Sequence, residues 1–255
     1  MAAKARAAIL GTTLLILLAA PLAGGFFPEK EEVADRIAKN YQELDSWKVS
    51  LEQNGTSKHR IISWRKKDLW RQEWIGPQGN STRVLRAAVG KGKQVLATHP
   101  ESSSIPLPPL NLGWIAAPLE KWDSLGIDAE TKSYQFLGDR PCLVLGAEYA
   151  DLEASQVWID IERHVPLRLI TEEGIGWRWM DYYNLGNHPL PSRMRLSFQN
   201  GRSQTFDLEW SQVATELSGS RFEESSLRRE MDQKEAPREI GPRLGHLLFS
   251  LPQAR

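Results

Sequence analysis

Between residues 156 and 210 the chain is a series of short segments in which apolar and polar residues alternate. The apolar members of the two plainest segments are Met194, Leu196 and Phe198 in the first, and Phe206, Leu208 and Trp210 in the second. Because side chains along a strand point alternately to opposite faces, each segment has one apolar and one polar face. The pattern predicts an antiparallel sheet that must be covered on its apolar face.

Residues 28–44 predict a helix ahead of the strands, because Val33, Ile37, Tyr41 and Leu44 recur at helical spacing after a proline and several glutamates. The apolar stripe of this helix should pack on the sheet. Strands separated by glycine, proline and asparagine turns are expected at residues 47–53, 59–64, 69–75, 83–89 and 94–98. This near-regular spacing predicts a meander in which consecutive strands pair.

Residues 99–112 interrupt the meander with Pro106, Pro108 and Pro109. Prolines fix the backbone and lack the amide donor, so this segment is expected to be a loop. Apolar residues at 105, 107 and 110 predict that the loop lies over an apolar surface. A short helix is expected at residues 114–125, followed by strands at 133–137 and 142–149.

The two ends of the chain differ from the middle. Lys4 and Arg6 precede an apolar run at residues 7–22 and small residues at 23–25, which is the layout of a secretory signal peptide. The run is shorter than the roughly 20 residues of a spanning helix, and an uncleaved membrane anchor is the alternative. Residues 1–25 are therefore interpreted as a signal peptide or N-terminal anchor of an exported protein. Residues 218–255, in which the stretch 223–239 is rich in charge and poor in large apolar residues, are predicted to be a disordered tail.

The amino-acid composition bears on the class of function and on the role of the cysteine. The 32 basic and 32 acidic residues cancel and are interspersed, which gives no electrostatic reason to expect nucleic-acid binding. A single cysteine, Cys142, excludes an internal disulfide. Because Cys142 stands in an apolar strand, we expect a buried and inert thiol.

Catalytic and metal motifs are missing from the sequence. None of the five histidines belongs to a zinc-protease pattern, and no Gly-x-Ser-x-Gly elbow occurs. Asp160, Glu162 and His164 have alternate spacing that could converge on a metal ion. However, residues 163–166 look like the turn between two strands, where polar residues gather anyway. We predict no catalytic residues, no metal site and no cofactor.

The ten tryptophans are the stronger signal. Trp70 and Trp74 share one strand face, and so do Trp177 and Trp179. They could be ordinary core packing, could line a wide apolar concavity, or could stack on sugar rings if they stood on an exposed surface.

Three segments carry a family resemblance. They are residues 64–71, Trp-Arg-Lys-Lys-Asp-Leu-Trp-Arg; residues 157–169, with an aspartate, a turn and Pro-Leu-Arg-Leu; and residues 183–194, with a Tyr-Asn-Leu and a Pro-Ser-Arg-Met. Together they resemble the periplasmic outer-membrane lipoprotein carriers, over residues 28–213. The basic residue of that family's early hairpin corresponds to Lys66 here, although the proline that usually follows it is Lys67.

The resemblance implies a mainly β fold with few helices: a curved antiparallel sheet that forms an incomplete, half-open β-barrel with helices over its concave face. Residues 26–217 would form this domain, whose apolar interior receives acyl chains. The same fold also serves as a sensor domain in envelope-stress regulators.

The leading hypothesis is a monomeric, non-catalytic periplasmic carrier that binds acyl chains of a lipid or lipoprotein, with residues 105–110 as a lid and Lys66 as a basic contact. The alternatives are a sensor or assembly protein that binds a membrane-associated protein partner, and a glycan-binding module. The predicted cavity residues are Ile62, Trp64, Trp70, Trp74, Leu107, Leu110, Trp177, Trp179, Met194, Leu196, Phe198, Phe206 and Leu208.

Overall fold

The computed structural model describes residues 27–54, 60–78, 81–92, 94–99, 118–149, 151, 153–172 and 174–232. The predicted signal peptide or anchor at 1–25, the predicted lid with Leu107 and Leu110, and the tail beyond 232 lie outside these residues.

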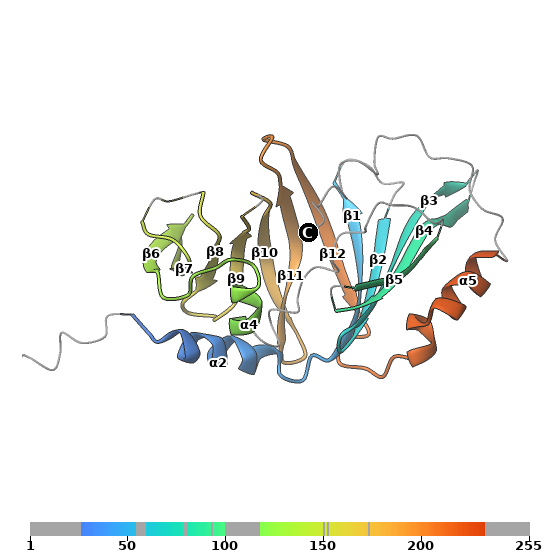
Figure 1. Cartoon of the computed structure of the whole chain (residues 1–255), viewed down its shortest axis with the longest axis horizontal. Coiled ribbons are helices and arrows are strands. Elements are labelled where there is room, and N and C mark those ends of the chain that lie inside the picture. The colour runs from blue at the N-terminus through green and yellow to red at the C-terminus, as the bar shows by residue number, and fades with distance from the viewer. Residues whose placement is uncertain are drawn as a thin grey trace, which may run out of the picture.

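The described strands form one antiparallel sheet of twelve strands (Figure 1). The first five are β1 (Ser46–Gln53), β2 (Arg60–Lys66), β3 (Leu69–Gln78), β4 (Ser81–Lys91) and β5 (Gln94–His99). The others are β6 (Lys132–Leu137), β7 (Arg140–Leu145), β8 (Gln156–Asp160), β9 (Pro166–Ile170), β10 (Gly176–Leu185), β11 (His188–Ser197) and β12 (Ser203–Ser211). The pattern-based prediction of a meander is confirmed twice, since β1 to β5 and β6 to β12 each pair in chain order.

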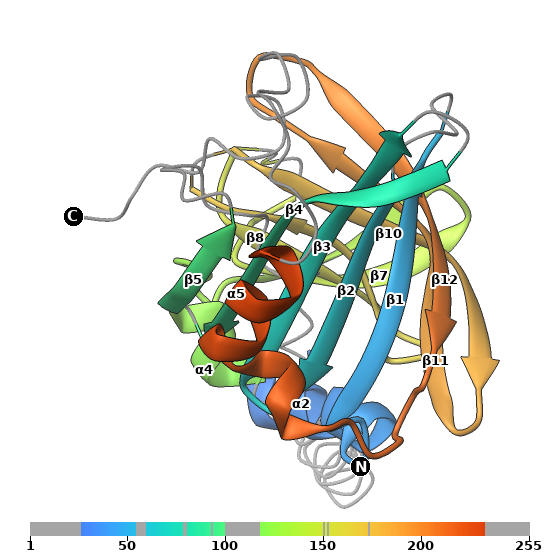
Figure 2. The same ribbon diagram turned by 90° about the vertical axis from the view of Figure 1, so that its right-hand side faces the viewer.

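The two meanders are joined by pairing of β1 with β12. The strand order runs from β5 through β1 and β12 to β6, and within the described residues β5 does not pair with β6. The curved sheet is therefore open, as Figures 1 and 2 show. The predicted incomplete barrel is confirmed.

Helices α2 (Lys30–Tyr41) and α4 (Pro118–Asp123) pack on one face, which we call the inner face. Val33, Ile37 and Tyr41 of α2 are buried there, as the helical spacing predicts, and Trp122 of α4 joins the same apolar cluster. The Tyr41 hydroxyl donates to the Pro189 carbonyl at 2.8 Å, which holds α2 against the start of β11. The predicted position of helices over the concave face is confirmed for these two.

A third helix differs from the expectation of a disordered tail. Residues Gly219–Phe222 form a 3₁₀ turn, η2, and Glu224–Asp232 form α5. They cover the opposite, outer face of β3, β4 and β5 (Figure 2). Phe222 and Leu227 supply the apolar side chains for this contact, and both are buried. Two apolar residues at suitable positions are enough to dock a segment that is otherwise charged.

An ion cluster fastens the same segment. Arg71 of β3 is fully buried and donates to Glu73 Oε1 at 2.8 Å, to the Arg221 carbonyl at 3.0 Å and to Glu230 Oε2 at 2.6 Å. The guanidinium thus joins β3 to η2 and to α5. A buried charge is tolerated only when it is paired in this way.

Candidate functional site

The inner face of β10, β11 and β12 carries a patch of large apolar side chains. Trp177 pairs with Leu196, and Trp179 pairs with Met194, whose other neighbour is Phe206. Leu208 continues the face to β1, where it pairs with Leu51. All of these side chains are buried in one cluster. The structure therefore brings together six of the predicted cavity residues, namely Trp177, Trp179, Met194, Leu196, Phe206 and Leu208.

Two indoles carry the inner face onto β3. Trp74 pairs with Ile61 and packs half-buried against the large cluster. Trp70 lies over Gly90, where an added Cβ would stand 2.1 Å from its ring, and its Nε1 donates to the Gly92 carbonyl at 3.1 Å. The predicted common face of Trp70 and Trp74 is present. Phe198, just after β11, also packs against the large cluster.

Ile62 and Trp64 do not share this face. Trp64 pairs with Arg71 and Ile62 pairs with Glu73, so both point to the outer face, where they pack with Leu217. Lys66 lies on the same side of β2, and its Nζ donates to the Leu217 carbonyl at 2.7 Å. The structure thus places Lys66, the predicted basic contact, at the attachment of the C-terminal segment and away from the inner face.

A polar pair on the inner face was missed by the sequence reasoning. Ser63 of β2 and Gln72 of β3 stand opposite one another and are only 1% and 3% exposed. Within the described residues, Ser63 Oγ and Gln72 Oε1 have no hydrogen-bond partner. Leaving a buried polar group unpaired costs about 1–3 kcal/mol. The available signal was the alternation of Ile61, Ser63 and Arg65, which the more apolar Ile62 and Trp64 obscured.

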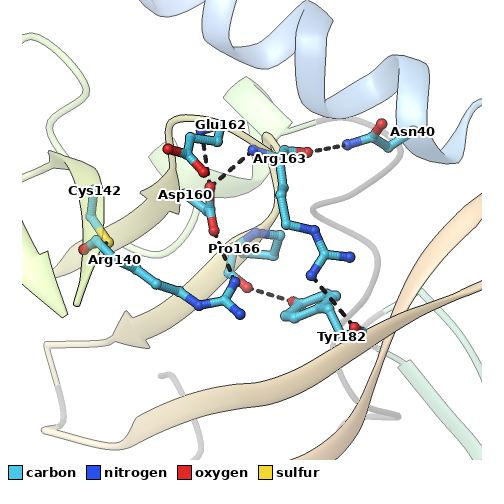
Figure 3. A network of polar contacts seen from close by, with 8 residues as sticks. All are labelled: Asn40, Arg140, Cys142, Asp160, Glu162, Arg163, Pro166 and Tyr182. Carbon is cyan, nitrogen blue, oxygen red and sulfur yellow. Dashed lines mark hydrogen bonds and ion pairs between the residues drawn. The ribbon is translucent and has the colours of Figure 1, made fainter. Parts of the chain in front are cut away.

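The metal-like spacing at residues 160–164 has a structural role (Figure 3). Asp160 is 3% exposed, and its Oδ1 accepts the backbone amides of Glu162 and Arg163, both at 2.9 Å. Its Oδ2 accepts from Arg140 at 3.0 Å. The carboxylate therefore closes the turn between β8 and β9 and ties this turn to β7.

Helix α2 also holds the turn between β8 and β9. Asn40 of α2 donates to the carbonyl of Arg163 at 3.0 Å (Figure 3) and to that of His164 at 3.0 Å. Burial, followed by the neighbouring Arg36, lowers the pKa of His164. In the described part of the chain no group of histidine, cysteine and acidic side chains could hold a metal ion. Asp160, which belongs to the segment 157–169 that resembles the carriers, therefore has a structural role.

Cys142 is fully buried on β7, in agreement with the expected environment of its thiol. Burial raises the pKa of this thiol to about 11. A thiol that is both protonated and inaccessible is a poor nucleophile.

A polar hollow of about 510 Å³ lies elsewhere, over β9 to β11. Its lining includes Glu153, Arg168, Glu172 and Gln199, and no aromatic side chain. Mixed charges around a single large apolar side chain, Ile170, do not suit an acyl chain. In the part of the chain that the structure describes, no helix has the length and apolar character to cross a membrane.

No protein-family model and no curated protein matches the chain. Solved structures do. A LolA superfamily protein from Nitrosomonas europaea matches with a TM-score of 0.49 and 13% identity, over 78% of this chain and 99% of that one. A putative outer membrane lipoprotein-sorting protein domain from Vibrio parahaemolyticus matches with a TM-score of 0.47 and 15% identity, over 78% and 97%.

A DUF1329 family protein from Desulfovibrio piger matches with a TM-score of 0.45 and 12% identity, over 79% of this chain and all of that one. The Nitrosomonas and Vibrio proteins are of the kind that residues 64–71 and 157–169 resemble.

Proposed function

We propose that the protein is a non-catalytic periplasmic carrier that binds acyl chains of a lipid or lipoprotein against the inner face of its sheet. The observation that supports this is the continuous apolar face from Trp177 and Trp179 on β10, across β11, β12 and β1, to Trp74 on β3. An apolar face on an open sheet that ends in indoles at both sides suits a flexible hydrocarbon chain.

The hydrophobic effect is sufficient for such a carrier. Each buried methylene contributes about 0.8 kcal/mol, so about eight of them give roughly 6 kcal/mol and a dissociation constant of tens of micromolar. This affinity permits transfer to an acceptor that binds more tightly. The buried Cys142 and the structural use of Asp160 favour a role without catalysis. Among the described tryptophans none is exposed, which disfavours stacking on a glycan.

The test is to look for bound lipid and to measure binding. Native mass spectrometry of the purified protein should show co-purified lipid, and a fluorescent fatty acid should be displaced by unlabelled lipid. Trp74→Ala on the inner face should weaken binding at least about tenfold, because an indole contributes about 1.5–3 kcal/mol of apolar contact. The matched control is Trp64→Ala on the neighbouring strand, whose ring lies on the outer face.

Affinities are compared per folded molecule, since both substitutions cost stability. Absence of both co-purified lipid and probe binding in the unmodified protein would refute the carrier function. Equal losses in the two variants would show that the inner face is not the binding surface.

A second candidate function is binding of a membrane-associated protein. It is favoured by Phe136 on the edge strand β6 and by Tyr149 after β7, which are 72% and 78% exposed. Exposed aromatic side chains are frequent at protein interfaces. Affinity capture from solubilised envelope membranes, lost in Phe136→Ser and kept in Trp74→Ala, would support this function over the carrier.

A further inference from the structure

The inner face is not uniformly apolar on β2, β3 and β4. A row of small or polar side chains crosses it, because Ser63 pairs with Gln72 and Gln72 pairs with Ala88. Trp70 and Trp74 stand on either side of this row, two residues before and after Gln72 on the same face of β3. Two residues along a strand span about 7 Å, so the row is a narrow polar strip between two indoles.

Polar atoms of this strip are buried without hydrogen-bond partners. Ser63, Gln72 and Ala88 are 1%, 3% and 0% exposed. Ser63 Oγ and Gln72 Oε1 find no partner among the described residues, and neither does Gln204 Oε1 on the same face of β12. Folded proteins pair nearly all such groups, so the buried Ser63 hydroxyl without a partner indicates a missing polar partner, and a hydroxyl can donate to an acceptor.

Charge indicates what kind of partner is missing. Arg65 lies beside Ser63 on the inner face of β2, and Arg86 lies opposite Trp74 on β4. In the described residues of β1 to β4, no carboxylate occupies an inner-face position. Arg65 donates from Nε to the Lys67 carbonyl at 2.6 Å and forms no ion pair with a described residue. A guanidinium presents several further donors in a fork that fits carboxylate and phosphate oxygens.

We propose that Arg65 and Ser63 form a subsite for the negatively charged oxygen group at the head of an acyl-chain ligand. The proposal rests on the proposed carrier function and adds the polarity and charge of its ligand. The head group accepts hydrogen bonds from the guanidinium and the Ser63 hydroxyl. The chain extends from this strip over the apolar face of β1, β12 and β11.

The desolvation of the Arg65 guanidinium is consistent with a bound anion at this subsite. Burial lowers the pKa of Arg65, which means that its charge is poorly hydrated in the protein without ligand. A bound anion would replace the lost hydration with hydrogen bonds. Unpaired polar groups that destabilise the free protein and are satisfied by the ligand are a familiar basis of specificity.

The first experiment compares three ligands with the same sixteen-carbon chain, through displacement of a neutral pyrene-labelled alkane from the full-length protein. Palmitate carries a carboxylate, 1-palmitoyl lysophosphatidate a phosphate, and hexadecanol no charge. We expect at least one charged ligand to bind about tenfold or more tightly than hexadecanol, as expected for charge-assisted hydrogen bonds. The better of the two identifies the head group as carboxylate or phosphate.

The second experiment uses variants with matched controls. Arg65→Gln should remove the preference for charged ligands without changing the affinity for hexadecanol. Arg60→Gln, on the same strand but on the outer face, should keep the preference. Ser63→Ala should weaken charged ligands and leave thermal stability equal or higher, because it removes an unpaired buried hydroxyl. Ser50→Ala on the outer face of β1 should change neither property.

Failure of the carrier function and failure of the subsite give different results in these experiments. If none of the three ligands displaces the probe, the carrier function is wrong and this subsite falls with it. If hexadecanol binds as tightly as both charged ligands, acyl binding stands and only the subsite is refuted. Equal effects of Arg65→Gln and Arg60→Gln would also refute it. If Arg65→Gln does not fold, the ligand comparison and the Ser63→Ala and Ser50→Ala pair decide the question.

Discussion

At the scale of single residues, Arg71 has the most demanding environment. Its guanidinium is fully buried, and its partner Glu73 is 9% exposed, so neither charge can be hydrated if the other is removed. Arg71→Met should lower the free energy of unfolding by about 3 kcal/mol, because it leaves Glu73 as a buried, unpaired carboxylate. Urea denaturation measures this change.

The double substitution Arg71→Met with Glu73→Met separates charge from packing. Because it removes both buried charges, it should recover much of the lost stability. Arg228→Met breaks an exposed pair with Glu224 and should cost less than about 0.5 kcal/mol. A single Arg71→Met variant as stable as the native protein would contradict the importance of this cluster.

Cys142 makes stability depend on pH in the alkaline range. Burial raises the pKa of the thiol from 9.0 to about 11, so the unfolded chain releases this proton at lower pH than the folded chain does. The stabilising effect is complete below pH 9 and is lost as the pH rises towards 11. At pH 10.5 the loss should be about 2 kcal/mol.

Cys142→Val should reduce the difference in unfolding free energy between pH 8 and pH 10.5 by this amount. In the native protein at pH 8, a thiol reagent should react with Cys142 only at the rate of unfolding. Fast modification of the folded protein would show that the thiol is accessible.

At the scale of elements, β2 differs from an ordinary half-covered strand. Its inner residue Ile61 belongs to the main apolar cluster, while its outer residue Trp64 packs with Leu217 and Phe222. At Ile61 and Trp64 both faces of the strand are therefore packed, the inner against the main cluster and the outer against the chain after β12. This is why the strand has apolar residues at consecutive positions.

The covering segment can be tested at Leu227, which is fully buried against Ala87 and Val89. Leu227→Ala should cost about 3 kcal/mol, as for other buried leucines. Ser225→Ala, on the exposed side of α5, is the control and should be close to neutral. If Leu227→Ala is neutral as well, the segment contributes nothing to the stability of the fold, which is what a disordered tail, as predicted from the charged composition, would do.

At the scale of the whole molecule, pairing of β1 with β12 makes one sheet of two meanders. The apolar cluster crosses the same boundary, since the rings of Trp47 and Trp210 meet edge to face with centroids 5.4 Å apart. Tertiary contacts that cross the junction should make the two halves unfold together. Residues 26–217 as one domain remain a prediction that this behaviour would support.

Urea unfolding followed by far-ultraviolet and near-ultraviolet circular dichroism should give coincident single transitions. Trp210→Ala should shift both curves together by about 3–5 kcal/mol, because it removes a buried ring at the junction. Two separated transitions, or a shift in only one of the signals, would show that the meanders are independent units.

The sequence predicted much of the fold because alternation and turn residues are local. Met194 and Leu196 define the inner face of β11, and the turn after Asp160 was recognised from its polar residues. The helix at residues 30–41 lies within the range predicted from its apolar spacing. The strand predicted for 142–149 ends at Leu145, since Gly146 has a φ of +95° and its neighbour Ser155 leaves no room for a side chain.

What the sequence determined by itself is which residues of each strand share a face, because this depends only on the two-residue period. Only the tertiary structure decided which of those faces is the inner one. On β2 the apolar residues Ile62 and Trp64 lie on the outer face, apart from most of the other predicted cavity residues, and a segment more than 150 residues later in the chain covers them. The same choice of face placed Ser63 and Arg65 inside. Alternation fixes relative directions, whereas the cover of a face comes from contacts between residues far apart in the chain.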